Sequence, residues 1–268
     1  MTRIGCVRAH NPSPMTLSGT NSYILDDGAG HAICIDPGPA IPAHIDAIVR
    51  ICEKLECTIE WICLTHGHPD HAPGATLLRE RVNARIAAHP KNLLTHDREL
   101  RDNDTVVAGG VALRGIETPG HSADHLVFHD ETIRALFTGD LVLGEGYVLI
   151  AAPDGDMRAY QTSLRRLLHD FGETETIFPG HGEPVSDPTG KLRDYLDHRA
   201  AREAQVLAAL QNGARTIAEL TRTVYPQIDK ALTQAAATQI LAHLIALERE
   251  DRVHSENRLG ATTYALTR

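Results

Sequence analysis

The densest group of potential metal ligands in the chain lies in the seven residues from Thr65 to His71. They read THGHPDH and hold three histidines and one aspartate: His66, His68, Asp70 and His71. The apolar residues WICL come just before them and predict a buried strand. Because side chains alternate along a strand, His66 and His68 are expected to point the same way where the strand ends. Imidazole and carboxylate groups are ligands of zinc and similar divalent cations, so this run indicates a metal site.

Three later segments share one pattern, an apolar run that ends in a glycine turn beside one ligand-type residue. They are TPGH, which ends at His121, TGD, which ends at Asp140, and PGHG, which contains His181. Each apolar run predicts a short buried strand, and the glycine permits a tight turn at its end. With the first cluster they supply seven ligands, the number expected for two metal ions that keep open positions. The alternative, a solvated histidine-rich loop without an ion, becomes the weaker interpretation.

As a set, these motifs resemble those of the metallo-β-lactamase superfamily over about residues 15–185. The resemblance implies an α/β fold, an αββα sandwich with the metals at one edge. It also implies two groups of ligands joined by a bridging carboxylate: His66, His68 and His121 for one metal, Asp70, His71 and His181 for the other, and Asp140 between them.

The same resemblance implies a hydrolytic mechanism. Two divalent cations, zinc first and manganese or iron as alternatives, would hold a bridging hydroxide, because coordination lowers the pKa of water to about 7. Asp70 is then the residue best placed to orient that hydroxide and act as the catalytic carboxylate. Asp36, in ICIDPG, matches a family position whose side chain orients the ligand loop without binding the metal itself. The simpler interpretation, an aspartate in a turn before Pro37, is compatible with that role. No GxSxG motif is present, which argues against a serine hydrolase.

Comparison within the superfamily narrows the predicted reaction. Secreted β-lactamases generally lack the carboxylate that Asp140 supplies, and flavodiiron reductases carry glutamate where this chain has His68. The interval from Asp140 to His181 is too short for the cap of the RNA 3′-end-processing nucleases. Glyoxalase-II-like thioesterases and the β-lactamase-like endoribonuclease group remain. The chain resembles the second group over nearly its full length, through NPSPMTLSGTNSYIL, LGEG, AYQTSLRRL and YLDHRAARE.

The endoribonuclease resemblance implies cleavage of single-stranded RNA and points to four further residues. Tyr160 is expected to reach the cleft from the helix after the metal loop. His198, Arg199 and Arg202 lie on the helix that follows the PGHG turn and are expected to meet an anionic group of the substrate. Ordinary helix packing or helix surface is the alternative interpretation for each.

The overall charge favours a different substrate class. A net charge of −9 and a pI near 5.9 do not give the broad basic surface of a nucleic-acid binder. RNA binding would need a local cluster drawn from Arg165, Arg166, Arg193, Arg199 and Arg202. A small ester, thioester, lactone or phosphoester is the competing substrate. An inactive binding or regulatory protein is a third alternative, against which the complete ligand set argues. The full-length resemblance leaves RNA ahead by a small margin.

The chain is predicted to divide into a catalytic domain, residues 1–190, and a smaller domain, residues 191–268. Before residue 190, apolar runs alternate with helical stretches near 41–56, 73–83 and 158–170, which is typical of a layered α/β domain. The later part predicts three helices and a β-hairpin, an arrangement that resembles a winged helix.

Two features of the smaller domain bear on its role. Thr216 and Glu219 have the spacing of a capping box, and the hairpin is expected to turn near Gly260. The last long helix has Lys230 and Arg249 at its ends and mostly alanine between them. A helix that binds the DNA major groove needs several polar side chains on one face. The domain is therefore expected to shape the substrate site, and duplex DNA is not an expected partner.

The sequence also predicts a cytoplasmic protein without a membrane partner. No apolar run is long enough to span a bilayer, and the N-terminal residues lack a secretory apolar core. The five cysteines are odd in number and form no CxxC pair, which favours reduced thiols and a cytoplasmic setting. Assembly into a homo-oligomer is left open.

Overall fold

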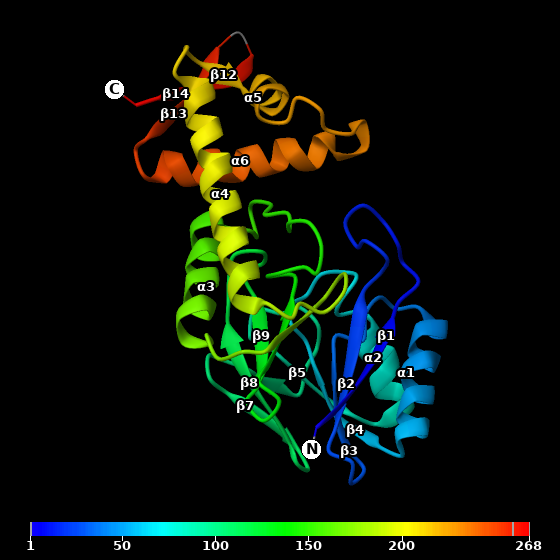
Figure 1. Cartoon of the computed structure of the whole chain (residues 1–268). Helices are drawn as coiled ribbons and strands as arrows, with labels where there is room; N and C mark the ends of the chain where they lie inside the picture. The colour runs from blue at the N-terminus through cyan, green and yellow to red at the C-terminus, as the bar shows by residue number, and fades with distance from the viewer. Residues whose placement is uncertain (1, 259, 268) are drawn as a thin grey trace.

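The larger domain is built around two facing β-sheets (Figure 1). The structure, a computed structural model, describes residues 2–258 and 260–267. The first sheet has six strands in the order β1-β2-β3-β4-β5-β6: β1 (Arg3–Arg8), β2 (Asn21–Asp26), β3 (His31–Ile35), β4 (Thr58–Cys63), β5 (Arg85–Ala88) and β6 (Arg98–Glu99). The second has five in the order β11-β10-β9-β8-β7: β7 (Thr105–Ala108), β8 (Val111–Glu117), β9 (Leu126–Asp130), β10 (Ala135–Gly139) and β11 (Thr176–Pro179).

Helices cover the outer face of each sheet. The pair α1 (Pro42–Leu55) and α2 (Gly74–Val82) packs on the first sheet, and α3 (Met157–Asp170) and α4 (Pro188–Leu210) pack on the second. Side chains along each predicted strand alternate between the two faces of its sheet. In β3, Ile33 and Ile35 enter the core between the sheets, whereas Ala32 and Cys34 face α1. The architecture is the αββα sandwich that the sequence predicted.

A small second domain follows the sandwich. It contains α5 (Ile217–Val224), the 3₁₀ turn η1 (Lys230–Leu232), α6 (Thr233–Arg249) and a three-stranded sheet of β12 (Arg215–Thr216), β14 (Ala261–Leu266) and β13 (Val253–Arg258). The predicted capping box at the start of α5 is present, since the Thr216 and Glu219 side chains each bond to the other's backbone nitrogen. Gly260, in the turn between β13 and β14, has a φ of +82°, a conformation that glycine adopts freely. The winged-helix prediction is confirmed.

Helix α4 joins the two domains into one body (Figure 1). Its first half contributes Leu192 and Tyr195 to the core of the sandwich, and its second half contributes Val206 and Leu210 to the core of the winged helix. The predicted boundary at residue 190 therefore falls inside a continuous helix, which serves both domains.

The alanine-rich helix α6 packs between the domains. Ala242 and Ala246 belong to the same core as Leu164 of α3, while Leu244 and Leu247 point into the winged helix. Small side chains permit this close approach, which explains the composition of the helix. The described part of the chain holds no helix with the length and apolar character of a transmembrane span, and all five cysteine thiols are free.

Candidate metal centre

All seven predicted ligands follow the ends of strands, and these ends meet at one edge of the sandwich. The loop after β4 carries His66, His68, Asp70 and His71; the loops after β8, β10 and β11 carry the other three. Their ligand atoms form two compact groups, one of His66, His68 and His121 and one of Asp70, His71, Asp140 and His181. The structure therefore brings together all seven side chains that the sequence predicted as ligands, from four separate loops.

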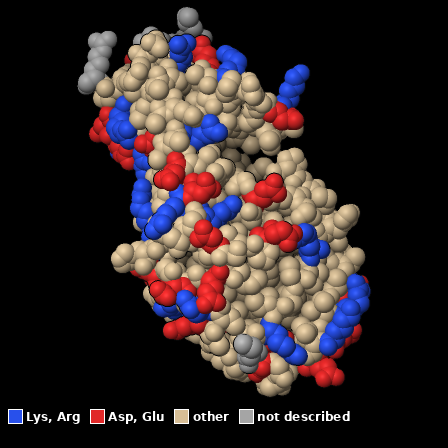
Figure 2. Space-filling model, in the orientation of Figure 1, with Lys and Arg blue, Asp and Glu red and all other residues tan. Residues whose placement is uncertain are grey.

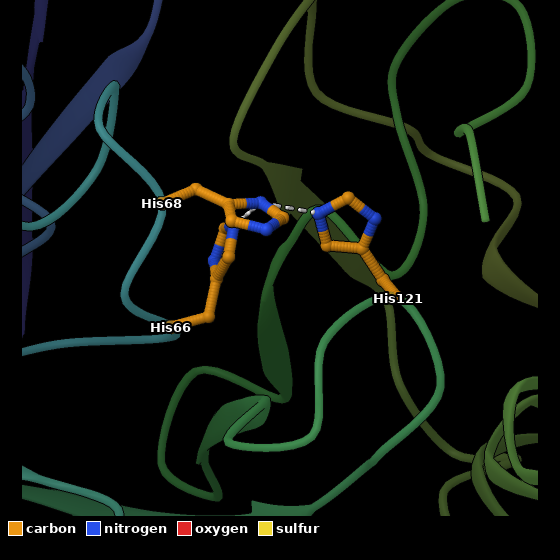
Figure 3. A group of neighbouring side chains, drawn as sticks. All are labelled: His66, His68 and His121. Atoms are coloured by element: carbon orange, nitrogen blue, oxygen red, sulfur yellow. Dashed lines mark hydrogen bonds between the residues drawn. The ribbon is translucent and has the colours of Figure 1, made fainter. Parts of the chain in front are cut away.

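The first group consists of three imidazoles that face one another (Figure 3). His68 Nδ1 lies 3.0 Å from His66 Nε2 and 2.9 Å from His121 Nε2. The Nδ1 atom of His121 lies 3.0 Å from the backbone carbonyl of Leu149, which can only accept a hydrogen bond. His121 is thereby fixed with its proton on Nδ1 and a free lone pair on Nε2, the form that binds a metal.

The second group surrounds the carboxylate of Asp140. Its Oδ1 atom lies 3.3 Å from His71 Nε2 and 3.4 Å from His181 Nε2, while its Oδ2 atom lies 3.7 Å from His121 Nε2 of the first group. Asp140 thus presents one oxygen to each group. Oδ1 is buried and makes no hydrogen bond of acceptable geometry to any described residue. A buried carboxylate oxygen aimed at several imidazole nitrogens suits a divalent cation, so the residues fit a metal centre.

The charges of the second group stabilise one another. Although burial favours the neutral acid, His71 and His181 hold the pKa of Asp140 well below its usual range. Burial likewise opposes the charge on His181, but Asp140 and Asp70 raise its pKa to about 9. The site therefore attracts positive charge, which a bound cation would supply in place of protons.

Asp36 holds the ligand loop from behind. Its carboxylate accepts hydrogen bonds from the Thr65 backbone nitrogen at 2.8 Å and from the Thr65 hydroxyl at 2.5 Å. The same carboxylate lies 2.8 Å from His71 Nδ1, and the Thr65 hydroxyl lies 3.0 Å from His66 Nδ1. These contacts keep the Nδ1 protons of both histidines pointing away from the centre and turn each Nε2 toward it.

A cleft of about 510 Å³ opens onto the metal centre. His68 and Asp70 are the partly exposed ligands, and both line the cleft with His121 and Asp140. The opposite wall comes from the winged helix and is mostly apolar, and it includes Tyr225, Ile228, Leu232, Ala235, Ala236 and Gln239. Figure 2 shows the surface hollowed between the small domain and the sandwich. The winged helix therefore forms part of the substrate site.

Three of the four predicted substrate contacts lie in this cleft, and the fourth does not. His198, Arg199 and Arg202 all line it. Tyr160 is fully buried, and its hydroxyl donates a hydrogen bond of 2.7 Å to the backbone carbonyl of Leu141. The expectation that Tyr160 reaches the substrate was wrong, because the helix turns this residue into the core under the Asp140 loop.

Sequence reasoning missed the residue that supports the loop after Asp140. The Tyr195 hydroxyl accepts a hydrogen bond of 3.0 Å from the Leu143 nitrogen and donates one of 2.9 Å to the Gly146 carbonyl. It thereby fixes the LGEG segment, which forms one side of the cleft. The only available signal was the position of Tyr195 in the YLDHRAARE motif, and that motif gave no direction for its side chain.

The comparison with known families agrees with this geometry. The family model described as the Metallo-beta-lactamase superfamily matches residues 15–181. The chain belongs to the metallo-β-lactamase superfamily. A second family model, the Beta-lactamase associated winged helix domain, matches residues 216–261. As a member of this superfamily the protein is a hydrolase, and its histidine and aspartate cluster is suited to divalent metal.

Relatives match this metallo-β-lactamase superfamily member along most of its length. The Beta-lactamase-like protein 2 homolog of Caenorhabditis elegans is 32% identical over 87% of this chain and 80% of the relative. The Atrochrysone carboxyl ACP thioesterase of Aspergillus chevalieri is 30% identical over 93% of this chain and 82% of the relative. These names do not single out the endoribonuclease group, so that finer assignment stays a prediction.

Solved structures show the same two-domain fold. A metallo-beta-lactamase family protein from Thermus thermophilus has a TM-score of 0.80 at 24% identity and covers 98% of each chain. A beta-lactamase domain protein from Burkholderia ambifaria has a TM-score of 0.84 at 22% identity, over 98% of this chain and 91% of that one. At these identities the likeness establishes the fold, winged helix included.

Proposed function

We propose that this protein hydrolyses an ester or thioester bond of a small acyl compound, with divalent cations, zinc first, at both ligand groups. The observation that carries this proposal is the cleft, which leads from the metal centre along a largely apolar wall. Such a lining suits a small molecule with an apolar part better than a polyanionic strand. The thioesterase among the relatives supports the same substrate class.

The chain's own residues have separate roles in this proposal. His66, His68 and His121 would hold one cation, and Asp70, His71 and His181 the other, with Asp140 shared. When bound, such cations supply Lewis acidity and lower the pKa of coordinated water to about 7. Asp70 is partly exposed to the cleft, and its Oδ2 atom lies 3.2 Å from His181 Nε2. Its carboxylate can therefore accept a proton from the attacking water and hold that water toward the substrate.

The apolar wall would hold the acyl chain. Leu143 and Val148 line the cleft from the loop after Asp140, and Ile228 and Leu232 line it from the winged helix. Removing each methylene from water contributes about 0.8 kcal/mol. We therefore expect turnover to improve as the acyl chain lengthens, until the chain outgrows the cleft.

The arrangement of charges argues against RNA as the substrate. Of the five arginines that RNA binding would draw on, Arg166 is paired with Asp102 at 2.7 Å, and only Arg199 and Arg202 line the cleft. On the face shown in Figure 2, basic and acidic side chains alternate and form no continuous basic track. A strand of RNA needs such a track to bind several phosphates. These observations favour the acyl compound over the RNA that the sequence placed ahead by a small margin.

A substrate panel tests the proposal. Metal-reconstituted protein is assayed on acyl thioesters of increasing chain length, on a lactone, on a phosphodiester and on single-stranded RNA. The expected result is thioester or ester turnover that rises with chain length and varies little with salt. Cleavage of RNA that falls steeply with salt, without turnover of any acyl compound, would overturn it.

A further inference from the structure

We propose that Arg199, assisted by Arg202 and Gln239, binds an oxyanion on the compound that the metal centre acts on. This inference deepens the proposed function and rests on it in one respect, that the compound is an acyl ester or thioester. It adds a recognition site for one negative charge to a cleft whose wall is otherwise largely apolar.

The first observation is the unusual burial of Arg199. Its side chain is 1% exposed and lines the cleft. One nitrogen, Nη2, donates a hydrogen bond of 2.6 Å to the Val148 carbonyl, and Nε has no hydrogen-bond partner. No acidic side chain in the described part of the chain lies within 4.0 Å of this guanidinium. A guanidinium stays charged in proteins, and a buried charge without a counter-ion is costly. A negative group in the cleft would offset that cost.

The neighbouring side chains add donors and no negative charge. Arg202, one turn further along α4, donates to the Gln205 side chain and the Val224 carbonyl and lies 4.5 Å from the Tyr225 ring centre. It too forms no ion pair with an acid among the described residues. Gln239 of α6 is 6% exposed; its oxygen accepts from the Ile150 nitrogen at 3.2 Å, while its Nε2 has no partner.

The acidic residues near these arginines have other partners. Glu203 binds Arg158 and Arg252, and Asp194 accepts from the Tyr147 hydroxyl. Asp154 and Glu145 line the same cleft, but neither forms an ion pair with Arg199 or Arg202; Asp154 accepts a hydrogen bond of 3.0 Å from the Ala123 nitrogen and lies 3.8 Å from His68 Nε2. Several other arginines of the sandwich surface, such as Arg79, Arg134 and Arg166, have carboxylate partners. The cluster of Arg199, Arg202 and Gln239 differs from them in offering only donors, which is the chemistry of an oxyanion site.

Arg199 also lies within reach of a small molecule bound at the metal centre. Its Nη2 atom binds the carbonyl of Val148, and the metal-ligand residue His121 binds the carbonyl of the next residue, Leu149. Two hydrogen bonds and one peptide unit thus connect the two side chains, so they are separated by a distance on the order of 10 Å. A compound with its scissile bond at the metal centre could place a carboxylate or phosphate at Arg199.

Two sources of the oxyanion have to be distinguished, a carboxylate on the acyl chain and a phosphate on the thiol that leaves. We suggest comparing three thioesters on the metal-reconstituted full-length protein. Adipoyl-N-acetylcysteamine has a terminal carboxylate, hexanoyl-N-acetylcysteamine has a methyl group in its place, and hexanoyl-coenzyme A carries phosphates on the leaving group. Succinyl and suberoyl thioesters extend the carboxylate series in length.

The proposal predicts a KM at least about tenfold lower for one anionic thioester than for the neutral one, since hydrogen bonds to a charged group contribute about 1.5–3 kcal/mol. Arg199→Met, Arg202→Met and Gln239→Leu should each reduce that preference, Arg199→Met the most. Arg222→Met, on the exposed face of α5, is the matched control and should retain it. If Arg199→Met does not fold, the Arg202 and Gln239 variants decide the question.

Binding of adipate and of inorganic phosphate, measured by calorimetry, provides a readout that does not depend on turnover. Weaker binding in the Arg199 or Arg202 variant supports the oxyanion site. Equal binding in all variants, or thioester turnover without any preference for the anionic compounds, would overturn it and leave the proposed function standing. Adipate binding that depends on Arg199, without turnover of any thioester, would instead refute the proposed function.

Discussion

His71 and Asp36 form a fully buried hydrogen-bonded pair, with 2.8 Å between Nδ1 and Oδ2. The histidine is 0% exposed and the aspartate 2%. Burial opposes charge on the imidazole, but Asp140 and Asp36 together raise the pKa of His71 well above its usual value. Because Asp36 holds the proton on Nδ1, Nε2 is the nitrogen that faces the centre, where a cation would replace the proton it carries. The arrangement sets the orientation of a ligand before any metal binds.

We expect Asp36→Asn to weaken metal binding by about tenfold to a hundredfold, since partners of metal ligands have effects of this size. The amide has no negative charge and can no longer satisfy the Thr65 hydroxyl and His71 together. Competition with a chelator measures the affinity. Asp46→Asn, on the surface of α1 where Asp46 pairs with Arg81, is the control. An unchanged metal affinity in Asp36→Asn would contradict the role given to this residue.

Asp140→Ala removes the carboxylate that faces both ligand groups. We expect hydrolysis of any substrate to fall by orders of magnitude, because the two ligand groups then no longer share a carboxylate. The circular dichroism spectrum should be retained, since the sheets and cores do not depend on this side chain. Activity close to that of the unchanged protein would contradict a mechanism with a shared carboxylate.

The sequence allowed the metal centre to be predicted because its ligands are set by local rules. In THGHPDH and the three glycine turns, the ligand type and the end of the strand lie within a few residues of each other. The wall of the cleft is formed by residues that lie far apart in the sequence, and local sequence patterns do not show which of them meet. Met15 and Ile228 line one cleft from opposite ends of the chain. For Tyr160, helical spacing placed the residue correctly on α3 but did not say which face is buried.

The winged-helix wall of the cleft can be tested by shortening one side chain. Leu232 lies at the end of η1 and lines the cleft. We expect Leu232→Ala to lower kcat/KM for a long-chain thioester by about fivefold, about 1 kcal/mol, while a short-chain thioester is little affected. Val107→Ala, on the exposed edge strand β7, is the control. Equal losses for both chain lengths would argue against an acyl-binding wall.

His243 gives a prediction for the stability of the interface between the domains. It is 0% exposed, neither ring nitrogen has a hydrogen-bond partner, and burial together with Arg199 lowers its pKa to about 3. The fold therefore favours neutral imidazole. Below about pH 6.5 the unfolded chain takes up a proton that the folded protein does not. This lowers the free energy of unfolding by about 1.4 kcal/mol per pH unit, down to the folded pKa.

His243→Leu should remove this contribution, so its stability should fall less than that of the unchanged protein between neutral pH and pH 5. Urea unfolding at both pH values measures the difference, and the exposed His10→Leu variant is the control. Parallel losses in the His243 and His10 variants would show that His243 is not held neutral by the fold.

The most direct test of the whole account is anomalous scattering from crystals of the protein reconstituted with zinc. We predict two metal peaks per chain, one among His66, His68 and His121 and one among Asp70, His71 and His181, with Asp140 between them. A single fully occupied peak after reconstitution, with Asp140 and His181 turned away from it, would contradict the two-metal centre.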